Sequence, residues 1–496
     1  MPTKKNTAKK AAPSKKGAVK ASKKNSAIGL APAGFLLVNM IPKALSAETH
    51  QDSEPHLTVN STNPKQIIGT AFTRDPGLGP NAPIFVSTNG GATWLLNSIV
   101  PSAAGSSATG DITTSFNRNA SKLYGAILRS NSGNQEFLRT STPFTPPPMT
   151  ILASRTEGDQ PFTHATTVTA GADAGKDRLY IGNNNVPDPT GRSATIDHSL
   201  NAGVAAPVFN TVRVEKRATV GQDGPQVRPV AHDDGTVYAA FYRWRTLSGN
   251  FPANTLIITS AEVVVVRDDQ GGNNANPYTH LLDPSDGLAG RRVATGLRFP
   301  FMIGGTAATG QQRIGGSLSL AVSPPSSSTI FLVYGDKPLA SPDFLTLHVR
   351  RSVDRGVTWS ADLLTLPAAT NGAVAINSNG VVGLLYQQLK AGRWVTHMRR
   401  SLNNGATWDD LILADTSATN PVKTFDPYLG DYCHLLAVRA DFYGIFSASN
   451  TPNPANFPNG VNYQRNANFV TQKLFKLDSV TVVPTSIDPF FFKLPS

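Results

Sequence analysis

The octet Ser87-Thr-Asn-Gly-Gly-Ala-Thr-Trp94 determines the expected fold, because it returns twice further along the chain. The later copies are Ser352-Val-Asp-Arg-Gly-Val-Thr-Trp359 and Ser401-Leu-Asn-Asn-Gly-Ala-Thr-Trp408, and Ser199-Leu-Asn-Ala-Gly203 is a damaged fourth copy. Asp or Asn at the third position can hydrogen-bond the backbone two residues on, which closes a turn. Gly at the fifth position supplies a positive φ. The Thr-Trp pair suits the start of a half-buried strand, so each octet predicts a β-hairpin.

Three of the five Trp residues end an octet, so most of the tryptophans lie in the predicted hairpins. We therefore interpret the octets as packing devices and not as catalytic elements. The residues expected to form them are Ser87, Asn89, Gly91, Trp94, Ser352, Asp354, Gly356, Trp359, Ser401, Asn403, Gly405 and Trp408.

The three octets resemble the Asp-box (BNR) repeat of the sialidase superfamily. In that family each box joins the third and fourth strands of a β-propeller blade, on the face away from the active site. The resemblance thus implies an all-β propeller of four-stranded blades and, as an expectation about function, activity toward glycans. Fold alone does not define an activity.

A second repeat pairs a short strand that follows a polar residue with a more apolar strand. The pairs begin near Glu54, Asp111, Asp159, Asp223, Gly316, Ala373 and Asp431. Self-similarity at a period of this length is typical of propellers and solenoids, and material for two further strands follows each pair. Seven blades are favoured by this count, and six blades are the alternative if one copy is spurious.

The amino-terminal part differs in composition from the rest. Nine lysines lie between Lys4 and Lys24, Lys43 is a tenth, and no acidic residue precedes Glu48. An apolar run over residues 27–41 follows the lysines and ends in small residues, which is the pattern of a secretory signal. We expect residues 1–47 to be a basic leader that is removed, residues 48–485 to be the propeller and residues 486–496 to be a tail, in a secreted, periplasmic or cell-surface protein. The alternative is a retained tail that contacts nucleic acid or an acidic surface.

The remaining body is close to neutral, because the ten leader lysines account for most of the formal net charge of +12. A neutral body does not suggest a nucleic-acid-binding surface. Cys433 is the only cysteine, so no intrachain disulfide is possible. Residues 267–277 are rich in Asp and Asn oxygens that suit Ca²⁺, but a solvated loop is favoured because the spacing of a calcium loop is missing. We predict neither a metal site nor a cofactor.

The repeat gives a map of possible site residues, because loops that enter the first strand and leave the second strand of each blade open on one face. Carboxylates and a phenol at that face are candidates for catalysis: Asp111, Asp159, Asp223, Asp431 and Tyr432. Cationic and aromatic side chains there are candidates for ligand binding: Arg74, Arg243, Trp244, Arg245 and Arg313. Arginines can bind an anion in a bidentate manner, and a glycosidase needs two carboxylates roughly 5 to 10 Å apart.

The resemblance implies more for a true sialidase than the chain contains. The family places its first arginine in a Phe/Tyr-Arg-Ile-Pro motif before the first blade, and the nearest string here, Leu297-Arg-Phe-Pro300, comes too late. We therefore expect a sialidase-like protein that is a glycoside hydrolase, or alternatively a non-catalytic propeller that binds a glycan or a protein.

Overall fold

The structure is a computed structural model that describes residues 1–2, 30–73, 82–101, 109–129, 134–156, 158–185, 193–221, 227–250, 253, 255–301, 317–337, 345–423 and 428–496. The regular secondary structure of the described residues is almost entirely β-strand, with two one-turn 3₁₀ helices, η1 (Lys43–Leu45) and η2 (Pro454–Asn456). No helix among them has the length and apolar character needed to cross a membrane. The all-β prediction is confirmed.

Six antiparallel sheets of four strands follow one another along the chain, and in each the spatial order of the strands is their order in the sequence. The first sheet consists of β2 (Ser53–Val59), β3 (Ile67–Phe72), β4 (Ile84–Ser87) and β5 (Leu95–Leu96). The second consists of β6 (Thr109–Phe116), β7 (Leu123–Arg129), β8 (Asn134–Thr140) and β9 (Thr150–Arg155). The third consists of β10 (Gly158–Thr167), β11 (Asp177–Asn185), β12 (Ser193–Ser199) and β13 (Asn210–Arg213). The fourth sheet consists of β14 (Arg228–Ala231), β15 (Val237–Ser248), β16 (Ile257–Asp268) and β17 (Arg291–Pro300). The fifth consists of β18 (Leu318–Ser323), β19 (Ser326–Asp336), β20 (Thr346–Ser352) and β21 (Leu364–Pro367). The sixth consists of β22 (Ala369–Ile376), β23 (Val382–Lys390), β24 (Arg393–Ser401) and β25 (Asp409–Ser417).

A seventh sheet joins the two ends of the chain. Its order is β26 (His434–Val438), β27 (Asp441–Ser449), β32 (Ile487–Leu494), β1 (Leu36–Asn39) and β28 (Asn462–Tyr463). A small sheet of β29 (Asn466–Asn468), β30 (Lys473–Phe475) and β31 (Val482–Val483) lies in the connection between β28 and β32.

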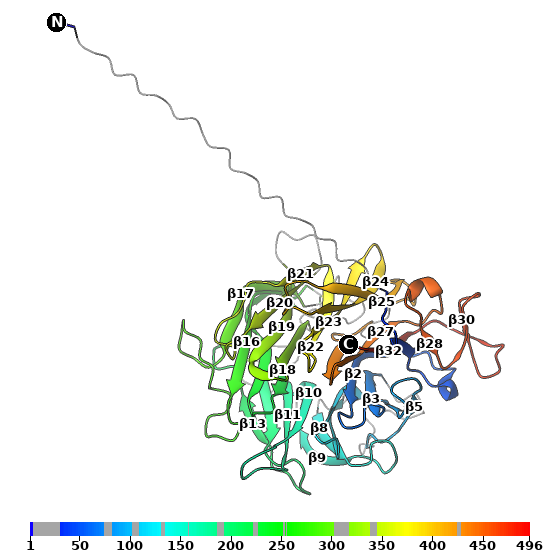
Figure 1. The fold of residues 1–496 in the computed structure, drawn as a ribbon, viewed down its shortest axis with the longest axis horizontal. Coiled ribbons are helices and arrows are strands. Elements are labelled where there is room, and N and C mark those ends of the chain that lie inside the picture. Colours follow the sequence, from blue (N-terminus) through cyan, green and yellow to red (C-terminus); the bar gives the residue numbers. More distant parts are fainter. Residues whose placement is uncertain are drawn as a thin grey trace.

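The seven larger sheets form a closed ring. The first strand of each sheet contacts the first strand of the next, in the order β2, β6, β10, β14, β18, β22, β26 and back to β2. Figure 1 shows the colours running around this ring, so that the blue strands β2 and β3 lie beside the orange and red strands β27 and β32. Apolar side chains fill the space between neighbouring sheets. The chain is therefore a β-propeller. The number of blades in the whole chain stays a prediction, with seven favoured.

Each octet forms the hairpin between the third and fourth strands of a sheet, as its sequence predicts. In the third copy the Gly405 N–H donates to Ser401 Oγ over 2.7 Å, the Thr407 N–H donates to Asn403 Oδ1 over 2.9 Å, and Trp408 Nε1 donates to the Gly405 carbonyl over 3.1 Å. The other two octets repeat these three bonds at 2.9 to 3.0 Å. The three octets thus adopt the same local structure.

The fifth-position glycines have φ between 84° and 90°, as expected. The fourth position also has a positive φ, at 79° for Gly90, 61° for Arg355 and 56° for Asn404, which the sequence analysis did not anticipate. Gly91 has a second reason to be glycine, because an added Cβ would lie 2.0 Å from the ring of Phe491 on β32. The damaged copy after Ser199 lies in the equivalent connection, between β12 and β13.

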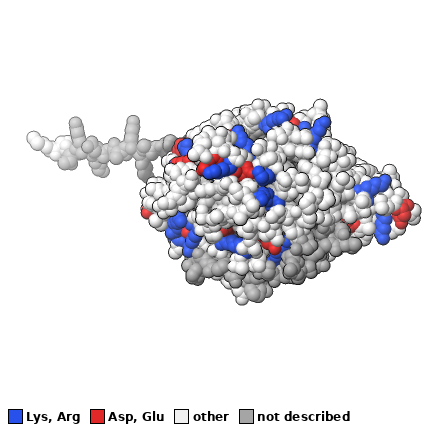
Figure 2. Space-filling model, turned by 90° about the horizontal axis from the view of Figure 1, so that it is seen from below, with Lys and Arg blue, Asp and Glu red and all other residues white. Residues whose placement is uncertain are grey.

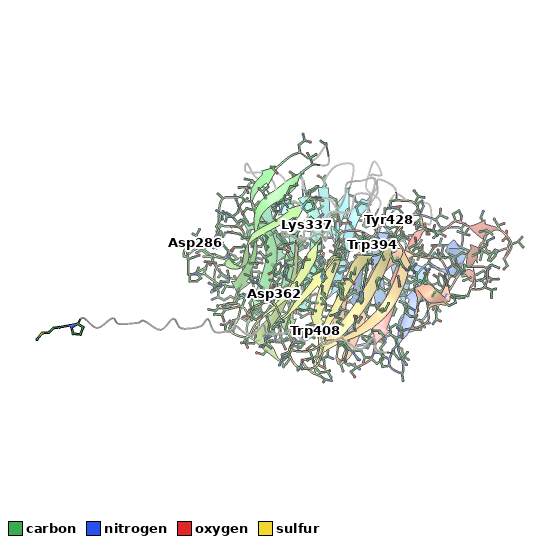
Figure 3. All side chains as sticks on the ribbon, turned by 90° about the horizontal axis from the view of Figure 1, so that it is seen from above. Asp286, Lys337, Asp362, Trp394, Trp408 and Tyr428 are labelled. Carbon is green, nitrogen blue, oxygen red and sulfur yellow. The ribbon has the colours of Figure 1, made fainter. Side chains whose placement is uncertain are left out.

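The octets lie on one face of the ring and the starts of the first strands lie on the other. Figure 3 places Trp408 of the third octet at one edge, and Lys337, which follows β19, and Tyr428, which precedes β26, toward the opposite edge. This arrangement matches the two-faced map that the repeat predicts.

The expected boundaries at residues 47 and 486 stay predictions, although a strand on the outer side of each boundary belongs to the seventh sheet. Leu36–Asn39 forms β1, which pairs antiparallel with β32 in the register Val38 with Phe491. Val38, Met40 and Ile41 are fully buried, between the first and seventh sheets. The apolar run therefore ends as a strand of the propeller, because its side chains complete the core at the joint between the two chain ends. Ile487–Leu494 likewise belongs to that sheet as its third strand, β32.

Candidate functional site

The first strands share an irregularity at the end opposite the octets. The pairing of β2 with β3 shifts between Ser53 and His56, and equivalent shifts occur near the start of β6, β10 and β22. Glu54, Gln160 and Asn371 within these shifts have φ values of 50°, 49° and 56°. Bulges of this kind redirect side chains. They bring polar residues from several sheets together at one end of the central channel.

A phenol and a carboxylate from the two sides of the first sheet meet there. Tyr432, which precedes β26, donates its hydroxyl to Asp111 Oδ1 on β6 over 3.0 Å. Burial, together with the carboxylates of Asp111 and Glu54, raises the pKa of Tyr432 well above its usual value. The phenol is therefore protonated at neutral pH, and it holds Asp111 as a hydrogen-bond donor.

Arg228 brings a positive charge to the same place from β14. Its guanidinium lies 3.8 Å from the ring centroid of Phe162 and 5.5 Å from that of Tyr432. Burial lowers the pKa of Arg228 to about 9, while Asp111 and Tyr432 act in the opposite direction. A cation over two aromatic faces is a favourable arrangement, and Arg228 is still charged at neutral pH.

Asp431 is held by residues of two other sheets. Its backbone N–H donates to Glu54 Oε1 over 3.1 Å, and its Oδ2 accepts from Gln160 Nε2 over 3.3 Å. Asp159 Oδ1 in turn accepts from the Gln160 N–H over 2.9 Å. We refer to Glu54, Asp111, Asp159, Gln160, Arg228, Asp431 and Tyr432 as the channel cluster. All seven residues are at most 8% exposed.

Two stacked histidines lie beneath the channel cluster. The rings of His56 and His434 are parallel with centroids 3.9 Å apart, and Phe162 packs edge-on against both. His56 Nδ1 accepts from the Thr114 N–H and His434 Nδ1 accepts from the Leu57 N–H, each over 3.3 Å. Burial and the neighbouring cations lower the pKa of His56, and they lower that of His434 to about 3. Both imidazoles are therefore neutral acceptors.

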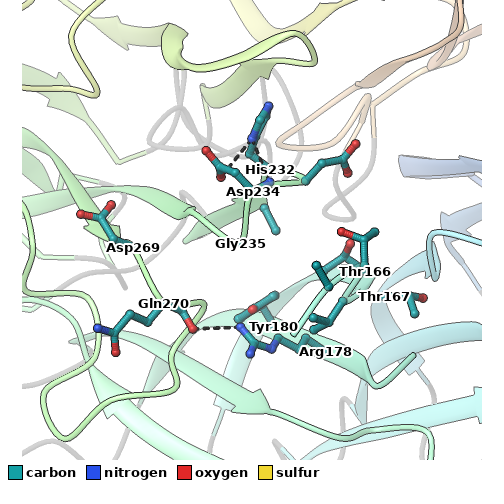
Figure 4. Close-up of a pocket in the computed structure, with 14 residues that line it drawn as sticks. Thr166, Thr167, Arg178, Tyr180, His232, Asp234, Gly235, Asp269 and Gln270 are labelled. Atoms are coloured by element: carbon teal, nitrogen blue, oxygen red, sulfur yellow. Dashed lines mark hydrogen bonds and ion pairs between the residues drawn. The ribbon is translucent and has the colours of Figure 1, made fainter. Parts of the chain in front are cut away.

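Several cavities lie among the described residues. One of about 300 Å³ occupies the channel and is lined by His56, Phe162, His164 and His434 among others. A second, of about 530 Å³, continues toward the octet face and is lined by Arg118, Asp233 and Arg439. A third, of about 300 Å³, lies between the third and fourth sheets, where Arg178 Nη1 donates to the Gln270 carbonyl over 2.9 Å (Figure 4).

The structure brings together four of the five candidates for catalysis. Asp111, Asp159, Asp431 and Tyr432 belong to the channel cluster, whereas Asp223 lies outside the described residues. Sequence reasoning missed Arg228, Phe162 and the stacked histidines. The sequence did contain a signal for His56 and Phe162. The strings Glu54-Pro-His56 and Gln160-Pro-Phe162 each place a polar residue, a proline and an aromatic ring at the bulge of a first strand.

The candidates for ligand binding that the structure describes do not join the channel cluster. Arg243 pairs with Glu262 over 2.7 Å and bonds the Ala218 carbonyl, and Arg245 lies 3.6 Å from the same carboxylate. Trp244 is only 4% exposed and packs edge-on against Phe301, so its ring cannot stack on a sugar. These side chains stabilise the fourth sheet. Arg74 and Arg313 lie outside the described residues.

Other acidic and basic residues do not form a single charged surface. Figure 2 shows Lys and Arg beside Asp and Glu on the face in view, among a majority of uncharged residues. In the Asp- and Asn-rich residues 267–277, the carboxylate of Asp268 is bonded within its own loop. Asp268 Oδ1 accepts from the Gln270 and Gly272 N–H groups, and Oδ2 accepts from Asn274 Nδ2 and the Tyr278 N–H. Asp268 is fully buried, so the loop and not solvent satisfies this carboxylate.

Similarity to known proteins is found at the level of structure. No family model and no curated protein sequence matches the chain. Among solved structures it is similar to the Penicillium chrysogenum alpha-L-arabinanase complexed with arabinobiose, at 12% identity and a TM-score of 0.43, over 92% of this chain and 98% of that chain. It is also similar to Drosophila Semaphorin 2a, at 10% identity and a TM-score of 0.43, over 84% of this chain and 75% of that chain. A third similar structure is the phage phi92 endosialidase, at 12% identity and a TM-score of 0.40, over 93% of this chain and 69% of that chain.

Proposed function

We propose that this propeller acts on a glycan at the channel cluster, as a glycoside hydrolase of the Asp-box type. The observation that supports this proposal most is that residues of three other sheets converge on the segment of Asp431 and Tyr432. Asp431 and Tyr432, adjacent in the chain, contact Gln160 of the third sheet and Asp111 of the second, and Arg228 of the fourth sheet lies over the Tyr432 ring. Separate carboxylates near a cation are the groups that glycoside hydrolysis requires.

The assignment of roles follows from the protonation states. Tyr432 keeps its proton at neutral pH, so it holds Asp111 in place and is not a phenolate nucleophile. The nucleophile or base is then a carboxylate, Asp111 or Asp431, and Arg228 supplies the positive charge for an anionic substrate group or for charge that develops during the reaction. A chemistry based on two carboxylates differs from that of a sialidase, in which a tyrosine attacks.

The alternative is a non-catalytic propeller that binds a glycan or a protein. One observation favours it: the channel cluster is buried, and its side chains bond one another across the ring. Such a network can serve to fix the ring and leave binding to the loops around it.

The experiment that separates these functions uses the full chain. It is assayed against fluorogenic sialosides and a panel of other aryl glycosides, together with Asp431→Asn and Asp111→Asn. Asp409→Asn, at an exposed position, is the control. We expect turnover by the wild type and the control, and a loss of about 100-fold or more in kcat for either channel variant. Thermal melting of each variant shows that it is folded.

An absence of turnover on every glycoside would overturn the catalytic proposal. A glycan array then tests the alternative: binding that Asp431→Asn weakens supports a glycan-binding propeller. No binding to any glycan would leave a protein partner as the remaining ligand class. Export of the protein stays part of the proposal, but any cleavage has to leave β1 attached.

A further inference from the structure

Three buried carboxylates lie at the joint between the two ends of the chain. They are Glu48 and Asp52, between β1 and β2, and Asp488 on β32. One oxygen from each lies within 4.8 Å of the other two. Since Ca²⁺ binds oxygen ligands at about 2.3–2.6 Å, three oxygens at these separations can all reach one ion.

Two of the three side chains have oxygens that no protein group satisfies. Asp52 is 1% exposed, and both of its carboxylate oxygens lack a hydrogen-bond partner, as does Glu48 Oε2. The other Glu48 oxygen contacts His50 Nδ1 over 2.9 Å. A buried carboxylate without a donor is strongly unfavourable, so these oxygens point to a ligand.

Asp488 is instead fixed by its neighbours. Asn39 Nδ2 donates to it over 2.7 Å, Asn450 Nδ2 over 2.9 Å and Ser486 Oγ over 2.8 Å, and Arg465 forms an ion pair with it. Arg465 also donates to the Glu48 carbonyl over 3.2 Å. Outer contacts of this kind orient the carboxylates of metal sites.

The charges in this cluster do not balance. Three carboxylates face one fully buried guanidinium, that of Arg465, which leaves two negative charges. A divalent ion would supply the missing charge.

We infer that Glu48, Asp52 and Asp488 form a binding site for a divalent cation with a preference for oxygen ligands, with Ca²⁺ as the best match. The ion would link the segment after β1 to β32, the strand with which β1 pairs. Its role would be to hold the ring closed where the two chain ends meet. The site is independent of the proposed glycan chemistry.

The test titrates Ca²⁺ into the full chain after treatment with EGTA, by calorimetry and by thermal melting at pH 7, with Mg²⁺ as a second probe. We expect one Ca²⁺ site and a rise of about 2 °C or more in Tm at saturation, because a ligand that binds only the folded state stabilises it. Asp52→Asn should weaken Ca²⁺ binding about 10-fold or more. In EGTA its Tm should equal or exceed that of the wild type, because the substitution removes repulsion.

Asp409→Asn is the control, and it should bind Ca²⁺ as the wild type does. If Asp52→Asn fails to fold, Glu48→Gln tests the same prediction. A wild type whose Tm and heats do not respond to either ion would overturn the inference, as would unchanged affinity in the cluster variants.

Discussion

Single residues of the octets hold the hairpins through bonds that lie within eight positions of the chain. Ser401 Oγ accepts from the Gly405 N–H over 2.7 Å and donates to Asn403 Oδ1 over 3.0 Å. The serine itself is fully buried. Its hydroxyl is therefore the acceptor for a buried backbone group, and no other acceptor for that group is found in the hairpin.

Removal of this hydroxyl should destabilise the protein measurably. Ser401→Ala leaves the Gly405 N–H without an acceptor, so we expect the free energy of unfolding to fall by about 1–3 kcal/mol. Leu402→Ala, at an exposed position of the same octet, should change it by less than about 0.5 kcal/mol. Urea unfolding of the two variants compares them, and equal effects would contradict the assigned role of the serine.

The stacked histidines should make the protein sensitive to acid. His434, partly accessible from the channel cavity, and His56 have folded pKa values below the ordinary value, because burial, their mutual contact, Arg228 and His164 disfavour their charged forms. The unfolded chain then binds more protons between about pH 6.5 and pH 4, so stability rises with pH across this window and is lost on acidification. Protonation also removes the Nδ1 acceptors of the Leu57 and Thr114 N–H groups.

His434→Gln tests this expectation, because a glutamine oxygen can accept a bond without titrating. The slope of unfolding free energy against pH should decrease by about 1.4 kcal/mol per pH unit between pH 6.5 and pH 4. Unfolding measured at half-unit intervals gives the two slopes. Parallel curves would show that these histidines do not titrate on unfolding in that range.

At the scale of elements, the strand β1 shows what composition alone does not decide. Residues 27–41 have the composition of a signal segment, yet Leu36–Asn39 pairs with β32 and buries Leu37 and Val38. Composition reports only that a segment is apolar. Whether it enters a membrane or a sheet depends on the presence of an unpaired strand edge, which here comes from residues more than 440 positions away.

Deletion of this element should destabilise the ring severely. A chain that starts at residue 48 loses β1 together with four buried side chains, those of Leu37, Val38, Met40 and Ile41. At about 1.5–3 kcal/mol each, the loss is comparable to the whole stability of a typical domain. Deletion of residues 2–26 should leave Tm within about 2 °C, because it leaves β1 in place.

Thermal melting and size-exclusion chromatography of the two truncated chains measure this difference. A folded, monomeric chain starting at residue 48 with an unchanged Tm would show that β1 is dispensable and would restore the signal-peptide interpretation.

At the scale of the whole molecule, ring closure creates both candidate sites. The channel cluster joins residues 321 positions apart, Asp111 and Tyr432, and the acidic cluster joins Glu48 and Asp52 to Asp488. Neither exists in an open chain. Loss of the closing sheet should therefore reduce ligand binding at both places, and Ca²⁺ should stabilise the intact ring.

The sequence by itself determined the features that depend on local chemistry. The octets predict their hairpins because every bond involved spans four residues or fewer, and the strand pairs predict the first two strands of each sheet because they are neighbours in the chain. The tertiary structure alone decided the partners of Tyr432, the burial of Trp244, the place of β1 and the grouping of Glu48, Asp52 and Asp488. Those depend on contacts between distant sheets, which form only when the ring closes.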